Sequence, residues 1–332
     1  MRHETVTVII PVRNRPELLV DAVNSVRAQS YPAIEIILVD DGSTDETPAV
    51  IARLERMHPR VVRAARGPGR GPGPAREVGR RMARGAFLQY LDSDDRLLPG
   101  KFAAQVRALR EHPEADIAYG ISRLVDAEGR VLKEPFKWTG RRKAYLFPDL
   151  LVDRWWCTHT PLYRRSLCDR MGPWSDLRYS QDWAYDARAG ALCARLAFVP
   201  EAVSEHRQHA GARQTGGAQW LEARDQVRFF GALFGGARKA GVAREAAEMQ
   251  HFSRWVFAAS RAAARAGDSD AARALYAIAR MAARGAAVDL AAYRRLAAVA
   301  GWPRAARWLE RFRGVRAPGR GTLRQSWMEP RE

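Results

Sequence analysis

Residues 87–95, Phe-Leu-Gln-Tyr-Leu-Asp-Ser-Asp-Asp, decide the fold of this chain. A short apolar run of this length is typical of a buried strand, and here it passes directly into three carboxylates, Asp92, Asp94 and Asp95. Acids packed this closely repel one another unless a cation or a network of hydrogen-bond donors neutralises them. Oxygen ligands at this density favour a hard divalent ion, Mg²⁺ or Mn²⁺, with positions left for phosphate oxygens. A solvated acidic turn is the alternative that these residues alone leave open.

The chain upstream of this stretch alternates strands and helices. Val6–Ile10 is a β-branched run that predicts a strand ending at Pro11, and Pro16 is placed to begin a helix. The apolar run Ile34–Val39 predicts a second strand that ends in acid, and Val61 and Val62 indicate a third. Continuous apolar strands in a β-α-β-α-β order predict an α/β fold with a doubly wound, mostly parallel sheet. Ligands bind such sheets at the carboxyl ends of the strands, where Asp41 and Asp94 are expected.

A glycine- and proline-rich segment, residues 66–74, precedes the acidic stretch and predicts a loop that is neither helix nor strand. Its glycines permit a close approach of the backbone to a ligand, and Arg66 and Arg70 are placed to meet phosphates. A flexible linker is the equally good alternative on composition. Residues 75–84 then predict a basic helix.

Residue patterns also predict the elements of the chain after the acidic stretch. The patterns predict a helix over 99–112, a strand over 117–124, a hairpin turn over 126–129, helices from Gln219 to about Phe312 with breaks near Gly235-Gly236, Gly267 and Gly285, and a tail from Arg316 to Glu332.

Positive charge is unevenly distributed along the 332 residues. Lys and Arg number 55 against 37 Asp and Glu, a formal charge of +18, and about +12 of it lies from Arg213 onward. Three interpretations stay open for this arginine excess: a solvated face in an arginine-biased proteome, peripheral docking on anionic lipid, or nucleic-acid binding. The arginines are dispersed without a reader motif, so no specific nucleic-acid partner is expected.

Cysteine content and hydropathy predict the compartment. Cys157, Cys168 and Cys193 are too few and too scattered for a disulfide framework or a zinc knuckle, which fits a reducing interior. The sequence shows neither a signal-peptide architecture nor a run of 18 apolar residues. We expect a cytoplasmic protein, with peripheral contact at the inner face of the membrane through its basic helices.

Four motifs in order resemble the family 2 glycosyltransferases, which have the GT-A fold. They are Val-Ile-Ile-Pro-Val-Arg-Asn, beginning at Val8, Val-Asp-Asp-Gly-Ser-Thr-Asp, beginning at Val39, Leu-Asp-Ser-Asp-Asp, beginning at Leu91, and Gln181-Asp-Trp. The match runs from about Val6 to about His209, and the residues after Gln219 carry no family signature. The resemblance implies a GT-A domain over 1–215, with a nucleotide-sugar half to about 98 and an acceptor half after it. A basic helical region over 216–315 and a disordered tail over 316–332 would follow.

The resemblance assigns roles to individual residues. It places Pro11, Val12, Arg13, Asp40, Asp41, Arg76 and Ser93 against the nucleotide, with Asp41 accepting a hydrogen bond from the base, typically uracil. Asp92 and Asp94 match the metal-binding Asp-x-Asp pair for Mn²⁺ or Mg²⁺, with Asp94 in direct contact. Asp95 and His209 complete the metal cluster. Asp182 matches the catalytic base, and Gln181 and Trp183 would contact the acceptor.

Sugar transfer requires the groups that the resemblance assigns, a metal site and a separate carboxylate. A divalent cation stabilises the departing diphosphate, and one carboxylate takes the proton from the acceptor hydroxyl. A single displacement inverts the anomeric configuration. We therefore expect an inverting, metal-dependent transferase that moves a sugar, UDP-linked as the resemblance implies, to a glycan or lipid-linked acceptor of the cell surface.

Two departures and two alternatives qualify this expectation. Glu77 stands where the family commonly has Asn, and the glycine-proline repeat before it is unusual. A nucleotidyltransferase would need a glycine-rich, lysine-containing loop after the first strand, and residues 11–16 are not one. A non-catalytic scaffold with a basic helical arm is the other alternative, against which the intact Asp94 and Asp182 argue. Structural ion pairs of Asp182 with Arg178 or Arg188 remain an ordinary explanation for that acid.

Overall fold

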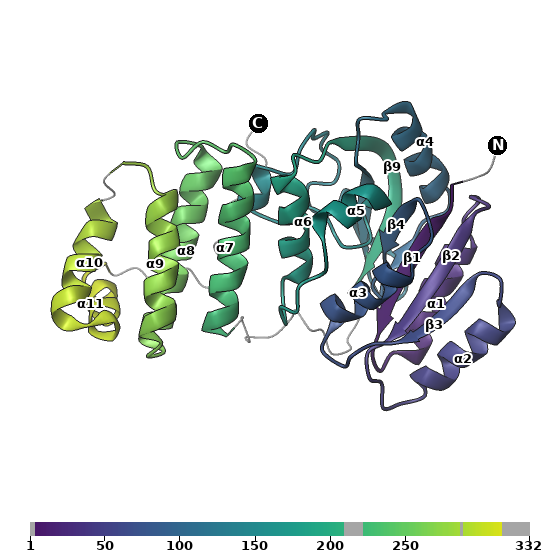
Figure 1. Cartoon of the computed structure of the whole chain (residues 1–332), viewed down its shortest axis with the longest axis horizontal. Helices are drawn as coiled ribbons and strands as arrows, with labels where there is room; N and C mark the ends of the chain where they lie inside the picture. The colour runs from purple at the N-terminus through teal and green to yellow at the C-terminus, as the bar shows by residue number, and fades with distance from the viewer. Residues whose placement is uncertain (1–3, 209–221, 286–287, 314–332) are drawn as a thin grey trace. The chain divides into compact units, whose positions relative to one another are not determined.

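The computed structural model describes residues 4–208, 222–285 and 288–313 (Figure 1). It divides into two compact units near residue 220, one of Met1–Trp220 with Gly235–Gly241 and one of Leu221–Phe234 with Val242–Glu332. His209 and the segment 316–332, for which roles or disorder were expected, lie outside the described residues.

A mixed sheet forms the first unit. Its strands are β1 (Val6–Val12), β2 (Ile34–Asp40), β3 (Val62–Arg66), β4 (Phe87–Tyr90), β5 (Arg96–Leu97), β6 (Ile117–Val125), β7 (Val131–Lys133), β8 (Leu162–Arg164) and β9 (Leu196–Arg207). They follow the order β3-β2-β1-β4-β8-β6-β9-β5, with β7 paired to β6. The strands β3, β2, β1 and β4 are parallel, as the apolar runs predict. The strand β8 then enters antiparallel between β4 and β6.

Helices cover both faces of this sheet (Figure 1). They are α1 (Pro16–Arg27), α2 (Thr47–Met57), α3 (Pro72–Met82), α4 (Lys101–Glu111), α5 (Arg165–Met171) and α6 (Gln181–Ala191), with a short 3₁₀ turn at Asp149–Leu151. The helices α1, α2 and α4 share one hydrophobic core with alternate residues of β1, including Val8 and Ile10. Ile9 points to the opposite face, where α3 packs so closely that a Cβ on Gly79 would lie 2.4 Å from the Ile9 side chain. This alternation places helices on both sides of the sheet, as a doubly wound fold requires.

The expectation that the first strand ends at Pro11 is wrong. Pro11 lies inside β1, opposite Val39 of β2. The amide of Asp41 donates to the carbonyl of Val12 on the β2 side, so Pro11 faces the other side, where β1 pairs with β4 only as far as Ile9 and Tyr90. The N–H that proline lacks is therefore not needed by the ladder.

The expected loop over 66–74 is shorter than predicted. Arg66 is the last residue of β3, and α3 begins at Pro72, three residues before the expected start. Proline at the first helical position has no N–H to leave unpaired, so residues 72–74 form the first turn of the helix and bring Arg76 to the sheet edge.

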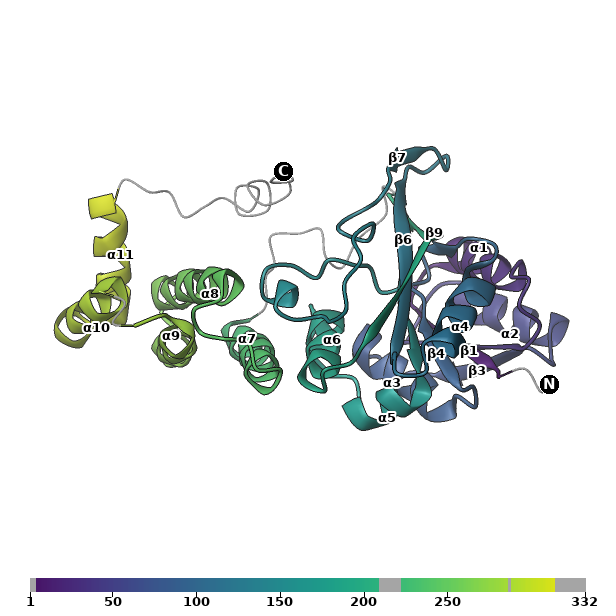
Figure 2. The ribbon, with the colours of Figure 1, turned by 90° about the horizontal axis from the view of Figure 1, so that it is seen from above.

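The second half of the sheet carries the long strands β6 and β9, which run side by side (Figure 2). The predicted hairpin turn is confirmed: the amide of Gly129 donates to the carbonyl of Asp126, and β7 pairs antiparallel with β6. The strand β9 also pairs with β5, so Glu205 lies opposite Arg96, the residue that directly follows the acidic stretch.

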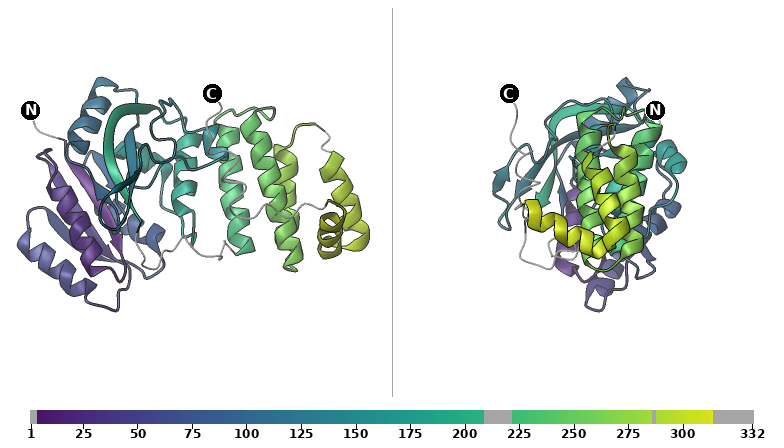
Figure 3. Two further views of the ribbon diagram at one scale, coloured as in Figure 1. Left: turned by 180° about the vertical axis from the view of Figure 1, so that it is seen from behind. Right: turned by 90° about the vertical axis from the view of Figure 1, so that its left-hand side faces the viewer.

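The second unit is helical, as expected (Figure 3). Its helices are α7 (Ala223–Lys239), which also contributes to the first unit, α8 (Ala247–Arg265), α9 (Ser269–Ala282), α10 (Val288–Ala300) and α11 (Trp302–Arg313). The helices α8 and α9 pack together, with Ser253 and Ser260 donating to backbone carbonyls of α9. Breaks at Gly267 and Gly285 are confirmed, but the break at Gly235-Gly236 is wrong because both glycines lie inside α7. No helix in the described part of the chain is long and apolar enough to cross a membrane.

Candidate active site

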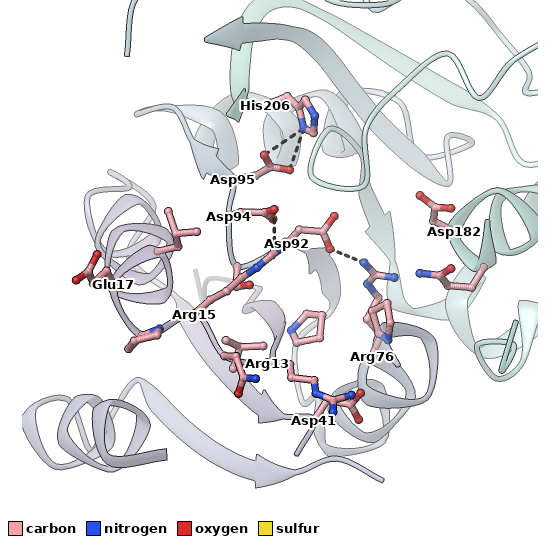
Figure 4. Close-up of a pocket in the computed structure, with 18 of the residues that line it drawn as sticks. Arg13, Arg15, Glu17, Asp41, Arg76, Asp92, Asp94, Asp95, Asp182 and His206 are labelled. Atoms are coloured by element: carbon pink, nitrogen blue, oxygen red, sulfur yellow. Dashed lines mark hydrogen bonds and ion pairs between the residues drawn. The ribbon is translucent and has the colours of Figure 1, made fainter. Parts of the chain in front are cut away.

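A pocket of about 690 Å³ opens where β1, β2 and β4 end (Figure 4). Its lining comprises the whole segment from Pro11 to Leu18, Asp41, Pro72 and Arg76, the acids and serine of the central stretch (Asp92, Ser93, Asp94, Asp95), the start of α6 (Ser180, Gln181, Asp182) and His206. Parallel strands place their carboxyl ends at one edge, which explains why motifs distant in the sequence meet here. Most of the predicted site residues are thus brought together. Asp40 and Trp183 do not line this pocket.

The carboxylate of Asp92 is paired with a buried arginine. Arg76, which is 2% exposed, donates from Nη2 to Oδ1 of Asp92, and its guanidinium lies 4.8 Å from the ring centre of Trp174. Its Nε and Nη1 have no hydrogen-bond partner among the described residues. A buried guanidinium with unused donors beside a pocket is suited to binding an anion.

Asp94 is paired with a second arginine, which the sequence did not single out. Nη1 of Arg15, in the turn between β1 and α1, lies 2.7 Å from Oδ2 of Asp94. Arg207 donates from Nε to the backbone carbonyl of Asp94 at 2.6 Å. Two neighbouring acids of the central stretch therefore each face a cation of the protein (Figure 4), which is the compensation that packed carboxylates require.

The third acid, Asp95, is 3% exposed and is held by protein donors on both oxygens. Its Oδ1 accepts the backbone N–H of Arg207 at 3.0 Å and lies 3.1 Å from Nδ1 of His206, and its Oδ2 lies 3.2 Å from Nε2 of His159. Burial alone would raise the pKa of Asp95, but the two imidazoles outweigh it and hold the pKa far below its usual value. The same pairing raises the pKa of His159 to about 10, against the effect of burial. Asp95 thus lines the pocket, but its carboxylate interacts with His159 and His206 and not with the arginines that pair with Asp92 and Asp94.

Asp41 accepts hydrogen bonds from the glycine-rich segment. The N–H groups of Gly69 and Gly71 donate to its two oxygens at 2.9 and 2.7 Å, and a Cβ on Gly67 would lie 2.8 Å from Oδ1. Gly69 and Gly71 have φ values of +70° and +101°, which favour glycine. Burial raises the pKa of Asp41, and the loop amides offset this only in part. The glycines therefore position an acid of the pocket.

Three other residues that were predicted to bind the nucleotide or phosphates, Asp40, Arg66 and Arg70, do not line this pocket. Asp40 accepts the N–H of Ser43 at 2.9 Å and so stabilises the turn after β2, outside the pocket. Arg70, expected to meet phosphates, forms an exposed ion pair with Asp176 at 3.3 Å, and Arg66 is exposed as well. Neither arginine lines the pocket, because the loop turns its glycine amides inward towards Asp41.

Asp182 lies in the first turn of α6 and is paired with Arg154, another residue that the sequence did not indicate. Nη1 of Arg154 donates to Oδ2 of Asp182 at 2.8 Å, and Nε donates to Oδ2 of Asp186 at 2.7 Å. Burial alone would raise the pKa of Asp182, but the charges of Arg154 and then Arg76 hold it below its usual value. The acid is therefore kept as a carboxylate, which is the form a proton acceptor needs. Arg178 and Arg188, the expected structural partners, interact elsewhere, with Tyr179 and with the carbonyl of Met171.

The two residues predicted to contact the acceptor, Gln181 and Trp183, have different surroundings. Gln181 lines the pocket, is 7% exposed, and its Oε1 has no partner among the described residues. Trp183 is half-buried and donates its indole N–H to the carbonyl of Leu150 at 2.9 Å. Trp155 and Trp156 are 0% and 1% exposed and belong to the core, which is the commoner place for large aromatics.

Glu77, the departure from the family pattern, has a structural role here. It is 9% exposed and accepts hydrogen bonds from Arg80, from Arg81 and from the N–H of Trp174. These bonds lower its pKa although burial opposes them. Glu77 thus stabilises the segment that carries Trp174, the ring beneath Arg76.

Comparison with known proteins places this chain in a family. Residues 7–172 match the model of glycosyl transferase family 2. A PGL/p-HBAD biosynthesis glycosyltransferase of Mycobacterium bovis BCG Pasteur is 30% identical over 217 residues, which is 63% of this chain and 79% of that protein. The succinoglycan biosynthesis protein ExoO of Rhizobium meliloti is 35% identical over 128 residues, which is 39% of this chain and 36% of that protein. The chain thus spans little more than a third of the length of ExoO, and 20% of the chondroitin synthase of Escherichia coli.

Solved structures share the fold. Residues 1–349 of Staphylococcus aureus TarS, in complex with UDP-GlcNAc, superpose with a TM-score of 0.65 at 17% identity over 93% of this chain and 92% of that one. A mannosyltransferase of Pyrobaculum calidifontis in complex with GDP-Man and Mn²⁺ gives a TM-score of 0.51 at 18% identity over 95% of this chain and 89% of that one. The expected GT-A fold with a helical C-terminal part is confirmed.

Proposed function

The chain belongs to glycosyl transferase family 2, and from this we propose that it is an inverting, metal-dependent glycosyltransferase that uses a nucleoside diphosphate sugar. The observation that carries the proposal is the convergence, in one pocket, of the pair Asp92 and Asp94 with a separate carboxylate, Asp182 (Figure 4). Charge compensation for a leaving diphosphate and a base for an acceptor hydroxyl are the two requirements of sugar transfer.

The nucleoside would bind at the end of the pocket that holds Asp41, beside Pro11, Val12 and Arg13. Asp41 is held in place by loop amides, so its oxygens are oriented before the ligand arrives. A carboxylate can accept the N3–H of uracil, and a UDP-sugar is the donor that we propose. Ser93 and Arg76 lie nearer to the acids and would bind the diphosphate.

Asp92 and Asp94 would hold the divalent cation, Mn²⁺ or Mg²⁺. The donor set fits, because these are hard carboxylate oxygens and both already attract a positive charge, that of Arg76 and of Arg15. When bound, the cation would offset the charge that develops on the diphosphate. The two arginines, once released from the acids, are placed to donate to phosphate oxygens.

Asp182 would accept the proton of the acceptor hydroxyl while that oxygen attacks the anomeric carbon. Arg154 keeps the carboxylate ionised and fixes its orientation through the bond to Oδ2. The side chain of Gln181 lines the same part of the pocket, and Trp183 presents its half-buried ring nearby in α6, so both would orient the acceptor. One base and one displacement lead to inversion.

The acceptor that we propose is a glycan or a lipid-linked saccharide of the cell surface, and the second unit has features suited to an anionic membrane. The helices α10 and α11 expose Arg294, Arg295, Arg304 and Arg307, together with Trp308, which is 51% exposed, and Val299, which is 90% exposed. Arginines beside exposed apolar side chains are typical of helices that rest on a lipid surface. The protein would then act at the inner face of the membrane.

Binding and turnover together test this function. UDP binding is measured by calorimetry with and without Mn²⁺, and UDP-sugar hydrolysis is measured in parallel, for wild type, Asp94→Asn and Asp182→Asn. We expect Mn²⁺-dependent UDP binding that is lost in Asp94→Asn, and a 10²- to 10⁴-fold loss of turnover with unchanged binding in Asp182→Asn. If wild type binds none of UDP, GDP and dTDP with metal present, the proposed function is wrong.

A further inference from the structure

A second cluster of possible metal ligands lies behind the acidic stretch. Cys157, His159 and His206 each bring one ligand atom to within 4.8 Å of the others. The first two come from the segment before β8, whereas His206 lies near the end of β9, so the fold, not local sequence, assembles the group. Asp95 lies between the two imidazoles, 3.2 Å from Nε2 of His159 and 3.1 Å from Nδ1 of His206.

The buried ring of His159 is a second observation that favours a ligand at this cluster. Its side chain is 0% exposed, yet neither ring nitrogen has a hydrogen bond of acceptable geometry among the described residues. The contact of Nε2 with Asp95 is close enough for an ion pair but is not directed along the N–H bond. Buried imidazoles normally have partners for their nitrogens, and an unsatisfied one calls for an explanation. His159 also interacts with the neighbouring thiol of Cys157, so a His-Asp pair alone does not describe this cluster.

The chemistry of the cluster differs from that of Asp92 and Asp94. One sulfur and two imidazole nitrogens are the ligands that zinc prefers, whereas Mg²⁺ and Mn²⁺ prefer oxygen. Cys157 is a free cysteine, and it is buried. In a tetrahedral zinc site, bonds of about 2.0–2.3 Å bring ligand atoms to roughly 3.5 Å from one another. The three ligand atoms lie within 4.8 Å of one another, so small side-chain movements would bring them to that separation.

We propose that Cys157, His159 and His206 bind one Zn²⁺ ion, with Asp95 orienting the two imidazoles as the outer carboxylate. Carboxylates in this position fix the ring orientation of metal-binding histidines. Only His206 lines the pocket, with its side chain 32% exposed, so the fourth position, held by water, lies towards that side. The ion would connect the turn after β4 with β9 and with the segment before β8.

This connection has a consequence for the neighbouring acids. Asp95 follows Asp94 directly, and the N–H and guanidinium of Arg207 bind both residues. Zinc would therefore hold the turn that presents Asp94 without being part of the donor site. The zinc content of the protein is independent of whether it binds a nucleotide sugar, so failure of this inference and failure of the proposed function are distinguishable.

Metal analysis of the full chain, purified without a histidine tag under reducing conditions, tests the inference. We expect about one zinc per chain after incubation with Zn²⁺ and gel filtration, and at least a tenfold loss of zinc in Cys157→Ser and in His159→Asn. Cys168→Ser is the matched control, because Cys168 is also fully buried but lies outside the cluster, and it should keep its zinc. Asp94→Asn should keep it too, which separates this site from the donor-site metal.

Substitution of the wild type with Co²⁺ gives a second readout that does not depend on the folding of any variant. A thiolate-to-cobalt charge-transfer band with intense visible d–d bands is expected for a tetrahedral site with one sulfur. Wild type that takes up less than a tenth of an equivalent of zinc, or cobalt-loaded wild type without the thiolate band, would overturn the inference. Undiminished zinc in folded Cys157→Ser would do the same.

Discussion

Arg154 donates from Nη1 to Oδ2 of Asp182 at 2.8 Å, and this pair joins the proposed catalytic base to the buried core. The same guanidinium binds Asp186, which also accepts the indole N–H of Trp156 and the hydroxyl of Tyr163, both at 2.8 Å. Asp182 is thus held by a network whose other members are buried, and its charge depends on a residue outside every motif of the family.

Replacement of Arg154 by Gln should move the acid limb of the pH-rate profile to higher pH. Arg154 holds the pKa of Asp182 below its usual value although burial opposes it, so the base stays ionised in wild type to a lower pH than it would without this arginine. The same interaction makes the free energy of unfolding depend on pH. It stabilises the fold above the pKa that Asp182 has in the unfolded chain, and this stabilisation is lost as the pH falls through the lower pKa of the folded state. The measurement is turnover against pH, and an unmoved acid limb in Arg154→Gln would show that Arg154 does not control the base.

The same substitution should also reduce stability, because it leaves the buried carboxylate of Asp186 without a cation, with only the neutral donors of Trp156 and Tyr163. Breaking one partner of a buried ion pair costs about 3–5 kcal/mol, which urea unfolding would measure. Arg154→Lys keeps the positive charge and should recover part of the stability and part of the pH profile. Equal losses in the Gln and Lys variants would indicate that packing, not charge, is what Arg154 supplies.

Asp40 and Asp41 are adjacent but should respond differently to the same change. Asp41→Asn removes the charge of a pocket-lining acid and should raise the Kd for UDP at least tenfold, since hydrogen bonds that involve charged groups contribute about 1.5–3 kcal/mol. Asp40→Asn keeps an oxygen for the N–H of Ser43 and should leave the Kd within about threefold. Calorimetry with UDP and Mn²⁺ decides between them, and equal effects would place Asp40 in the nucleotide site after all.

Arg15 should compete with the cation for Asp94. In Arg15→Gln a free Mn²⁺ ion no longer has to displace the guanidinium, so Mn²⁺ should bind several-fold more tightly in the absence of nucleotide. Asp94→Asn should weaken Mn²⁺ binding instead, and Asp270→Asn, an exposed acid in the second unit, is the control. Mn²⁺ titration followed by electron paramagnetic resonance provides the measurement. Weaker Mn²⁺ binding in Arg15→Gln would contradict the competition.

Gly67 should tolerate no side chain because its neighbour is the carboxylate of Asp41. The Cβ of Gly67→Ala would lie 2.8 Å from Oδ1 of Asp41 and 3.2 Å from the carbonyl oxygen of Asp40, so the loop must shift and UDP affinity should fall. Gly231→Ala in α7 has open space and a helical backbone, and should raise stability by up to about 1 kcal/mol without changing UDP affinity. Unchanged UDP affinity in Gly67→Ala would mean that the position of Asp41 does not matter for the nucleotide.

Membrane contact through α11 should depend on charge. Replacing Arg304 and Arg307 by Gln removes about 1 kcal/mol of attraction each, so binding to vesicles rich in anionic lipid should fall about 30-fold. Neutral phosphatidylcholine vesicles serve as the control and should bind neither protein. Co-sedimentation of the full chain measures both, and equal binding of wild type and double variant to anionic vesicles would exclude these arginines as the contact.

Local sequence patterns were sufficient to predict most strands and helices of the first unit. They were misleading where the tertiary environment removes or outweighs the cost of a proline or a glycine. The apolar run 34–39 and the proline at the start of α1 depend only on neighbours in the sequence, and both were predicted correctly. Pro11 was predicted to end its strand because proline lacks a donor, but its position beyond the end of β4 makes that donor unnecessary. Gly235 and Gly236 were predicted to break a helix, yet their cost of about 1 kcal/mol each is small enough for α7 to continue through them.

The sequence by itself determined the order of strands and helices, the family, and the arrival of Asp41, Asp92 and Asp94 at one edge of a parallel sheet. Hydrophobic periodicity and motif order are properties of neighbouring residues, so they can be read directly. Only the tertiary structure decided which group neutralises each acid. Arg154 is 28 residues from Asp182 and His206 is 111 residues from Asp95, and no local pattern encodes such pairs. They arise because burial removes water from charged groups, which then require whatever partner the packed chain brings within reach.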